Sequence, residues 1–161
     1  DVTLLAKYNL GTDYRQTTSE NRVTFSDNYG WEFNPGPKEI DIFAWSKFPK
    51  TYVNNYVSWF KQKLNIDDIT GNLITLLELE KLGCSIPSDY ATGDDYTCAN
   101  SQYASWLLNG QYWWTRSAFS DDSIRIWRVN SNGGLGGNSY NYSKSVGIRP
   151  IITVPLEILN K

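Results

Sequence analysis

The chain has 161 residues, of which 40% are hydrophobic, 20% charged and 15% aromatic, with a net charge of −2. This composition predicts one globular domain spanning residues 1–161. The slightly acidic balance and the absence of basic runs argue against a nucleic-acid partner. No apolar stretch approaches the roughly 20 residues of a membrane span, so we expect no membrane insertion. Histidine is absent, which excludes a Ser-His-Asp triad and any His-ligated metal within the chain.

The N-terminal half contains an expected strand at residues 2–10 and a second, short candidate strand at residues 23–25, within polar, turn-rich sequence that continues to residue 38. A helix is expected over residues 51–64, because apolar residues recur there at steps of three and four.

Because the chain contains no Met, we expect it to come from a longer translation product.

A second, shorter helix is expected over residues 76–82. Thr75 and Glu78 have the spacing of a capping box, in which each side chain accepts a hydrogen bond from the backbone amide of the other. Gly83 supplies a residue that can adopt the left-handed conformation which ends many helices.

The two cysteines, Cys84 and Cys98, flank a polar, turn-rich segment. A disulfide between them would close a loop of about 15 residues and contribute about 3 kcal/mol in the chain-entropy view. It requires an oxidising location. The alternative is a pair of free, partly buried thiols.

After Cys98 the pattern changes from helical to β. Strands are expected at residues 112–117, 123–129 and 146–154, with a hairpin turn at 130–134 and a returning strand from Leu135. Pro150 inside the last of them predicts an edge position or a bulge. The order indicates an α+β fold in which the last strand pairs with the first and brings the termini close together.

Residues 118–145 are dominated by Ser, Asn, Gly, Asp, Tyr and Arg. Antibody binding loops use the same residue types, with Tyr for contact area and small polar residues for hydrogen bonding. Tyr140 and Tyr142 share one face at i, i+2, and Phe119 is an aromatic residue among Ser and Asp. The ligand-contact candidates are Phe119, Asp121, Asp122, Arg125, Arg128, Asn138, Tyr140 and Tyr142. The adjacent aspartates could form a metal or acid–base pair, but solvated carboxylates are the commoner case, so we expect no metal, cofactor or catalytic residue.

Four large side chains near this segment favour a structural role. Trp113 and Trp114 are adjacent, so in a strand they face opposite sides, and we expect them to be mainly core residues. Arg116 and Arg149 are single cations beside aromatic strands. We expect their guanidinium groups to bind loop carbonyls and stack on rings, with an anion clamp as the alternative.

Three blocks carry a resemblance to a known group of proteins: residues 113–117 (WWTRS), 127–133 (WRVNSNG) and 146–152 (VGIRPII). They are similar to a W-[LT]-R-S, V-N-x-x-G, G-[VI]-R-P pattern in bacterial and phage domains. Those domains look like members of the C-type lectin fold, related to formylglycine-generating enzymes and to the variable proteins of diversity-generating retroelements. The resemblance implies a C-type lectin-like fold with two helices packed against antiparallel sheets.

The resemblance also implies a function. It indicates a non-catalytic receptor-binding protein whose hypervariable surface, at about residues 118–145, recognises a macromolecular ligand, either protein or glycan. Its expected location is extracellular, on a cell surface or on a virion (tail) surface. One alternative is an enzyme related to formylglycine generation, which would use a late cysteine pair. Another is a glycan-binding lectin, and the Glu-Pro-Asn, Gln-Pro-Asp and Trp-Asn-Asp motifs of calcium-dependent lectins do not occur in the chain.

Overall fold

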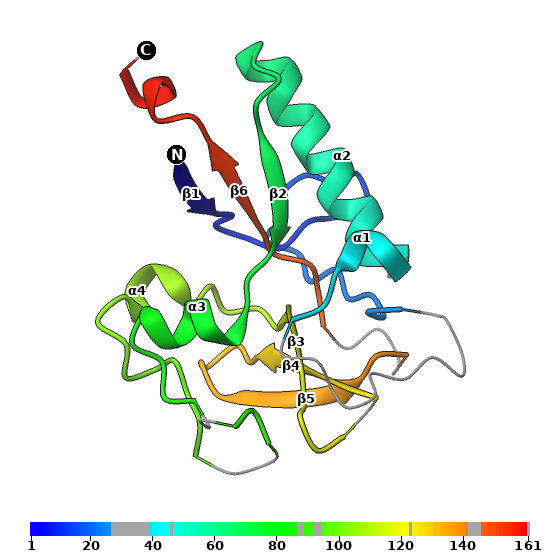
Figure 1. The fold of residues 1–161 in the computed structure, drawn as a ribbon, viewed down its shortest axis with the longest axis vertical. Helices are drawn as coiled ribbons and strands as arrows, with labels where there is room; N and C mark the ends of the chain where they lie inside the picture. Colours follow the sequence, from blue (N-terminus) through cyan, green and yellow to red (C-terminus); the bar gives the residue numbers. More distant parts are fainter. Residues whose placement is uncertain are drawn as a thin grey trace.

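The computed structural model describes residues 1–26, 39–45, 47–86, 89–91, 95–122, 124–141 and 146–160. Over these residues the chain forms two three-stranded antiparallel sheets with helices beside them (Figure 1), which confirms the expected α+β class. The elements in chain order are β1 (Val2–Leu5), α1 (Ile42–Trp45), α2 (Lys47–Leu64), β2 (Thr70–Leu73), α3 (Leu76–Lys81), α4 (Ala104–Leu107), β3 (Trp113–Ala118), β4 (Arg125–Val129), β5 (Leu135–Ser139), β6 (Pro150–Val154) and the 3-10 helix η1 (Leu156–Asn160).

The first sheet joins the two ends of the described chain in the order β1-β6-β2. Val2 pairs with Val154, so the expected pairing of the first and last strands is confirmed. Both strands are shorter than expected, and β6 is central rather than at an edge, so the edge prediction for Pro150 is wrong. Pro150 is the first residue of β6, and its carbonyl accepts a hydrogen bond from Ala6 N at 2.9 Å. Proline has no N–H to return this bond, and the Ala6 carbonyl accepts from Arg149 Nε instead.

Helix α2 packs closely against β2 because Gly71 has no side chain. A Cβ at Gly71 would lie 2.6 Å from Val57 Cγ2 and 2.9 Å from Val53 Cγ1. The helix begins at Lys47, four residues before the expected start, because its first turn tolerates Pro49. The buried face of α2 therefore fixes the position of this sheet.

Helix α3 starts with the expected capping box. Thr75 Oγ1 accepts a hydrogen bond from Glu78 N at 3.1 Å, and Glu78 Oε1 accepts one from Thr75 N at 3.0 Å. Gly83 follows the helix with φ of +94°, which confirms its left-handed conformation.

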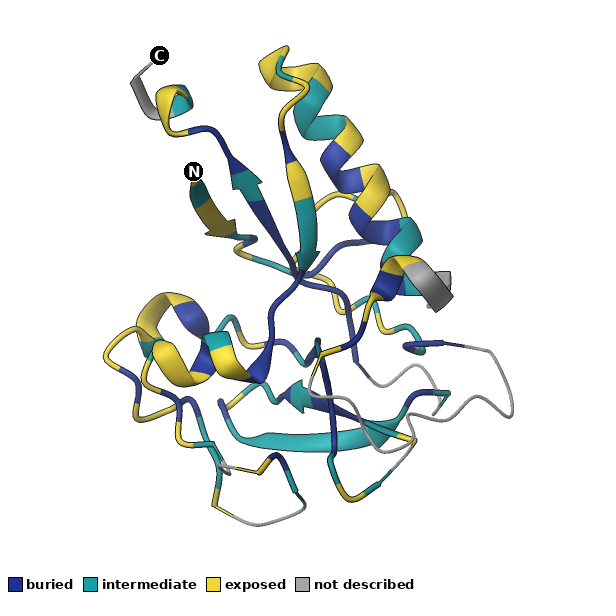
Figure 2. Ribbon diagram, viewed as in Figure 1, coloured by how far each residue is buried: buried dark blue, intermediate teal, exposed yellow. Residues whose placement is uncertain are grey.

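The second sheet, of order β3-β4-β5, lies between two hydrophobic clusters. Trp114 belongs to the cluster that includes Phe25 and Tyr56, whereas Trp113 belongs to the cluster that includes Leu79 and Cys98. Both indoles are fully buried, as expected for adjacent strand residues that face opposite sides. Figure 2 shows this burial as the dark blue interior, with exposed yellow residues on the outer sides of α2 and α3.

Two arginines hold the sheets and loops together, and the contacts of Arg149 confirm its structural interpretation. Arg149 is 1% exposed, and its guanidinium hydrogen bonds to the carbonyl oxygens of Ala6, Trp106 and Leu107 while lying 5.0 Å from the Trp113 ring centroid. Burial lowers the pKa of Arg149 to about 9. Arg116 donates from Nε to the carbonyl of Leu73 at 3.0 Å, and its Nη1 pairs with Glu39 Oε2 at 3.5 Å, so it binds a backbone carbonyl and a carboxylate.

Within the described segments, no helix has both the length and the apolar character to cross a bilayer.

Candidate functional site

The candidate residues of segment 118–145 divide into buried and accessible positions. Phe119 is 2% exposed, so the expectation that it lies on the surface is wrong. Its ring stacks on Trp127, with centroids 4.0 Å apart and an interplanar angle of 25°. The residues before and after Phe119 in sequence are small or polar, but its neighbour across the sheet is an aromatic ring, and that contact determines its burial.

Tyr140 is 4% exposed and belongs to the cluster that contains Trp114 and Ile126, which also corrects its expected exposure. Strand β5 ends at Ser139, and the backbone of Tyr140 is bound on both sides. Its N–H donates to the carbonyl of Ile124, and its carbonyl accepts from Ser26 N, both at 2.9 Å. The expected partner of Tyr140, Tyr142, lies outside the described residues.

Asp121, Asp122 and Arg125 lie at the solvent side of the β3–β4 connection. Arg125 Nε is 3.6 Å from Asp122 Oδ2, and both side chains are more than a third exposed. Such an ion pair contributes at most about 1 kcal/mol. The Arg125 guanidinium also lies 5.6 Å from the centroid of the Phe119 ring. Arg125 therefore lies against the buried aromatic pair without being part of the core.

Arg128 and Asn138 lie on neighbouring strands, on the same face of the sheet. Arg128 pairs with Gly136 across the strands, and a Cβ at Gly136 would lie 2.3 Å from Arg128 Nη1, so the guanidinium covers the glycine. Asn138 is two residues further along β5 and shares that face. Within the described residues, Arg128 Nη1 and Asn138 Oδ1 have no hydrogen-bond partner. Both atoms are shielded from solvent, on the face of the sheet that also carries Trp114 and Ile126.

Electrostatics and an aromatic contact both act on Arg128. Burial lowers its pKa, and the positive charge of Arg125 acts in the same direction. The ring of Tyr112 lies 6.0 Å from the Arg128 guanidinium and 5.4 Å from that of Arg22. Two cations thus share one aromatic ring beside β4. The sequence carries no signal for this arrangement, because Arg22 and Arg128 are far apart in the chain.

The Cys84–Cys98 disulfide, expected from the sequence, is present. It anchors the segment that supports the β4–β5 hairpin: Cys98 N donates to the Gly133 carbonyl at 2.7 Å, and Leu135 N donates to the Tyr96 carbonyl at 2.9 Å. The β4–β5 hairpin, which carries Arg128 and Asn138, is therefore stabilised both by its pairing with β3 and by hydrogen bonds to the disulfide-linked segment outside the sheet.

The chemistry available at these positions is hydrogen bonding and charge pairing. In the described parts of the chain, no three Asp, Glu or Cys side chains gather closely enough to hold a metal ion. At the surface, Asp121, Asp122 and Arg125 contribute two carboxylates and one guanidinium group, which can bind complementary polar groups on another molecule. Arg128 and Asn138 are only partly exposed.

Comparison with known proteins gives one match. Residues 47–156, more than half of the chain, match the family described as a domain of unknown function, DUF6273. All of the candidate ligand positions lie inside the matched segment. No curated protein and no solved structure matches the chain.

Proposed function

The chain belongs to the DUF6273 family, and we propose that it is a non-catalytic ligand-recognition domain. One observation carries the proposal: segment 118–141 separates into two sets of side chains. The frame set is buried and comprises Phe119, Ile126, Trp127, Val129 and Tyr140. The display set comprises the exposed Asp121 and the partly exposed Asp122, Arg125, Arg128 and Asn138.

This separation suits binding because the frame set stabilises the fold, whereas the display set provides the polar groups that can contact a ligand. The frame set lies at most 4% exposed in the two hydrophobic clusters, so it fixes the strands independently of a ligand. A surface that is already ordered loses little conformational entropy on association. The display set offers both signs of charge and an amide, which suits a polar macromolecular surface, either protein or glycan.

We further propose that the fold is C-type lectin-like. The pairing of β1 with β6, the helices α2 and α3 and the late sheet β3-β4-β5 support this assignment. So do the three sequence blocks at residues 113–117, 127–133 and 146–152, which supply β3, the β4–β5 hairpin and the start of β6.

Most specifically, we propose that the chain is a variable protein of a diversity-generating retroelement and acts outside the cell, on a cell surface or a virion tail. The composition of residues 118–145 supports diversification, and the disulfide supports an oxidising location. An enzyme of the formylglycine-generating type would use a late cysteine pair. Both cysteines of the chain instead precede β3 and are joined in the disulfide beside the hairpin.

The direct test is deep sequencing of the genomic locus in a natural population. The proposal predicts substitutions concentrated in the codons of the display set and of Tyr142, with the frame set unchanged. It also predicts a nearby reverse transcriptase gene and an imperfect repeat of this segment that differs at adenines. The exposed α2 residues Asn54, Ser58 and Gln62 are the control, because they are accessible but lie outside the segment. Substitutions spread equally over display, frame and control codons would overturn diversification.

A further inference from the structure

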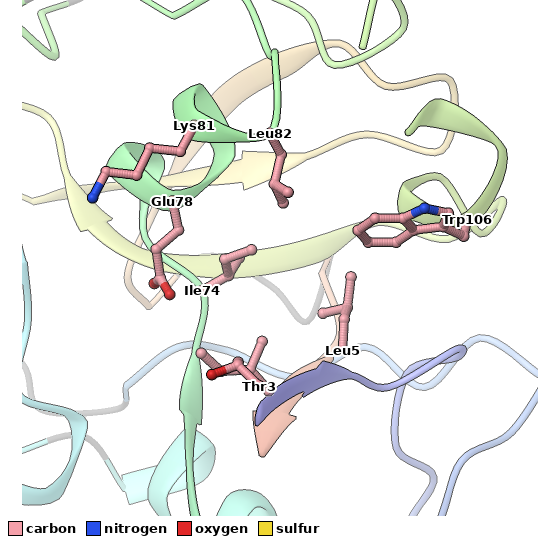
Figure 3. Close-up of a pocket in the computed structure, with 8 residues that line it drawn as sticks. Thr3, Leu5, Ile74, Glu78, Lys81, Leu82 and Trp106 are labelled. Atoms are coloured by element: carbon pink, nitrogen blue, oxygen red, sulfur yellow. The ribbon is translucent and has the colours of Figure 1, made fainter. Parts of the chain in front are cut away.

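A groove separate from the display set lies between the first sheet and the helices α3 and α4 (Figure 3). Its volume is about 270 Å³. The apolar lining consists of Leu5, Ile74, Leu82, Trp106 and Ile151. We name it the β1 groove. It could accept one large apolar side chain.

Trp106 is the most informative residue of this groove. It is 47% exposed, and its ring lies 5.4 Å from that of Tyr103, which is 36% exposed. Trp106 also lines a second hollow of about 380 Å³, shared with Lys7 and Asn109. Exposed aromatic side chains beside an apolar groove are typical of interaction sites.

Strand β1 presents a free edge beside the groove. Ala6 N donates to the Pro150 carbonyl, so Ala6 is a hydrogen-bonded position of the β1–β6 ladder. Such positions occur at every second residue of an antiparallel strand, and Thr3 and Leu5 fall between them. The backbone groups of Thr3 and Leu5 therefore point away from β6. Among the described residues no hydrogen bond reaches them, and Figure 1 shows β1 as the outermost strand of its sheet.

Two exposed lysines lie beside the β1 groove. Lys81 is at its rim, and Lys7 follows β1 and lines the second hollow. The lining contains one carboxylate, that of Glu78, which accepts a hydrogen bond from the amide of Thr75 in the capping box. This balance favours an occupant with acidic groups.

We propose that an extended acidic peptide segment of a partner protein adds to the free edge of β1 and inserts an apolar side chain into the β1 groove beside Trp106. Thr3 and Leu5 supply both the outward backbone groups and part of the groove lining. A peptide strand on this edge therefore places every second side chain toward the groove. This docking site is independent of the display set.

The probe is a fluorescein-labelled peptide, Thr-Asp-Thr-X-Thr-Asp-Thr, in which the two Asp residues share a face with X. Fluorescence polarisation should show binding with X as Phe or Leu, and about tenfold or weaker binding with X as Ala, because the groove contact is lost. Replacing both Asp by Lys should also weaken binding. Failure of every acidic peptide to bind would overturn the proposal.

Two variants test the edge and the groove separately. Thr3→Pro removes an outward N–H without breaking the pairing with β6, and Trp106→Ala removes the groove wall. Each should weaken peptide binding about tenfold while the melting temperature of the free protein stays near that of the wild type. Leu77→Ala, at an exposed α3 residue outside the groove lining, is the matched control and should bind as the wild type does.

Further measurements distinguish peptide binding at the β1 edge from binding by the display set and from dimer formation. Asp121→Ala and Arg125→Ala should leave peptide binding unchanged, because they alter only the display set. Hydrogen exchange of the Thr3 and Leu5 amides should slow when the peptide is bound. Unchanged binding in both Thr3→Pro and Trp106→Ala would contradict the site. A dimer of the chain that forms in light scattering and is abolished by Thr3→Pro would show that a second copy occupies the edge instead.

Discussion

The ring of Phe119 occupies the space where a side chain of Gly137 would stand: a Cβ at Gly137 would lie 2.3 Å from Phe119 Cε1. Gly137 pairs across the strands with Trp127, on which Phe119 stacks. The glycine is therefore part of core packing, although it lies in a run of Gly, Asn and Ser that reads as a loop. Close packing, rather than flexibility, requires glycine here.

Gly137→Ala should destabilise the fold by about 1–3 kcal/mol, because Phe119 is buried and its ring must shift to make room for the methyl group. Urea unfolding measures the change. Gly134→Ala is the control in the adjoining turn. Its Cβ would meet only the ends of the Asn130 and Asn132 side chains, both at 3.3 Å. Its effect should stay within about 0.5 kcal/mol, and equal losses in the two variants would contradict the packing role of Gly137.

The sequence was sufficient to predict those elements whose signals are local. The capping box at Thr75 and the core positions of Trp113 and Trp114 were predicted, because spacing and strand alternation determine them. The disulfide was one of two alternatives, since its formation also depends on the redox environment. Strand β2 was missed. Its residues, Thr70–Leu73, carry little apolar pattern, and they form a strand because β6 pairs with them and α2 packs on Gly71.

The candidate site was less predictable, because burial there depends on distant contacts. Phe119 and Tyr140 have mostly small or polar neighbours in sequence, which favoured exposure. Their actual neighbours come from other strands: Trp127 for Phe119, and the cluster around Trp114 for Tyr140. Asp121, Asp122 and Arg125 were placed correctly at the surface, since charged residues in a turn have no reason to be buried.

Removal of the disulfide should destabilise the protein and loosen the hairpin. The Cys84→Ala, Cys98→Ala double variant should lose about 3 kcal/mol in urea unfolding, because a loop of about 15 residues is no longer closed in the unfolded state. Native-state hydrogen exchange should show the amides of residues 98 and 135 exchanging faster, since the first donates to Gly133 in the hairpin and the second donates to Tyr96 in the supporting segment. Unchanged exchange at both amides would contradict the supporting role of this segment.

Tyr56 should make stability fall at alkaline pH. Burial raises the pKa of its hydroxyl from 10.0 to about 12. The folded state therefore retains the proton, so the stabilisation is complete below pH 10 and is lost as the pH rises through 12, by about 2–3 kcal/mol. The free energy of unfolding should be compared between the wild type and Tyr56→Phe over this range. The difference between them should change with pH, and a constant difference would refute the assignment to Tyr56.

Calcium should not alter the stability of the domain. The display set contains two adjacent carboxylates, Asp121 and Asp122, and an ion that binds only the folded state would raise the melting temperature. We expect equal melting temperatures in millimolar calcium and in EDTA, measured by differential scanning calorimetry. A clear rise with calcium would favour the calcium-dependent lectin alternative.

The most direct test of ligand recognition by the display set is selection from a randomised library. Asp121, Asp122, Arg125, Arg128 and Asn138 are varied together on yeast-displayed protein, and a control library varies the exposed α2 residues Asn54, Ser58 and Gln62. Both are selected against the same panel of purified proteins and glycans. The account predicts specific binders with wild-type melting temperatures from the display library and few or none from the control. Equal yields from the two libraries, or unfolding of most display-set variants, would contradict it.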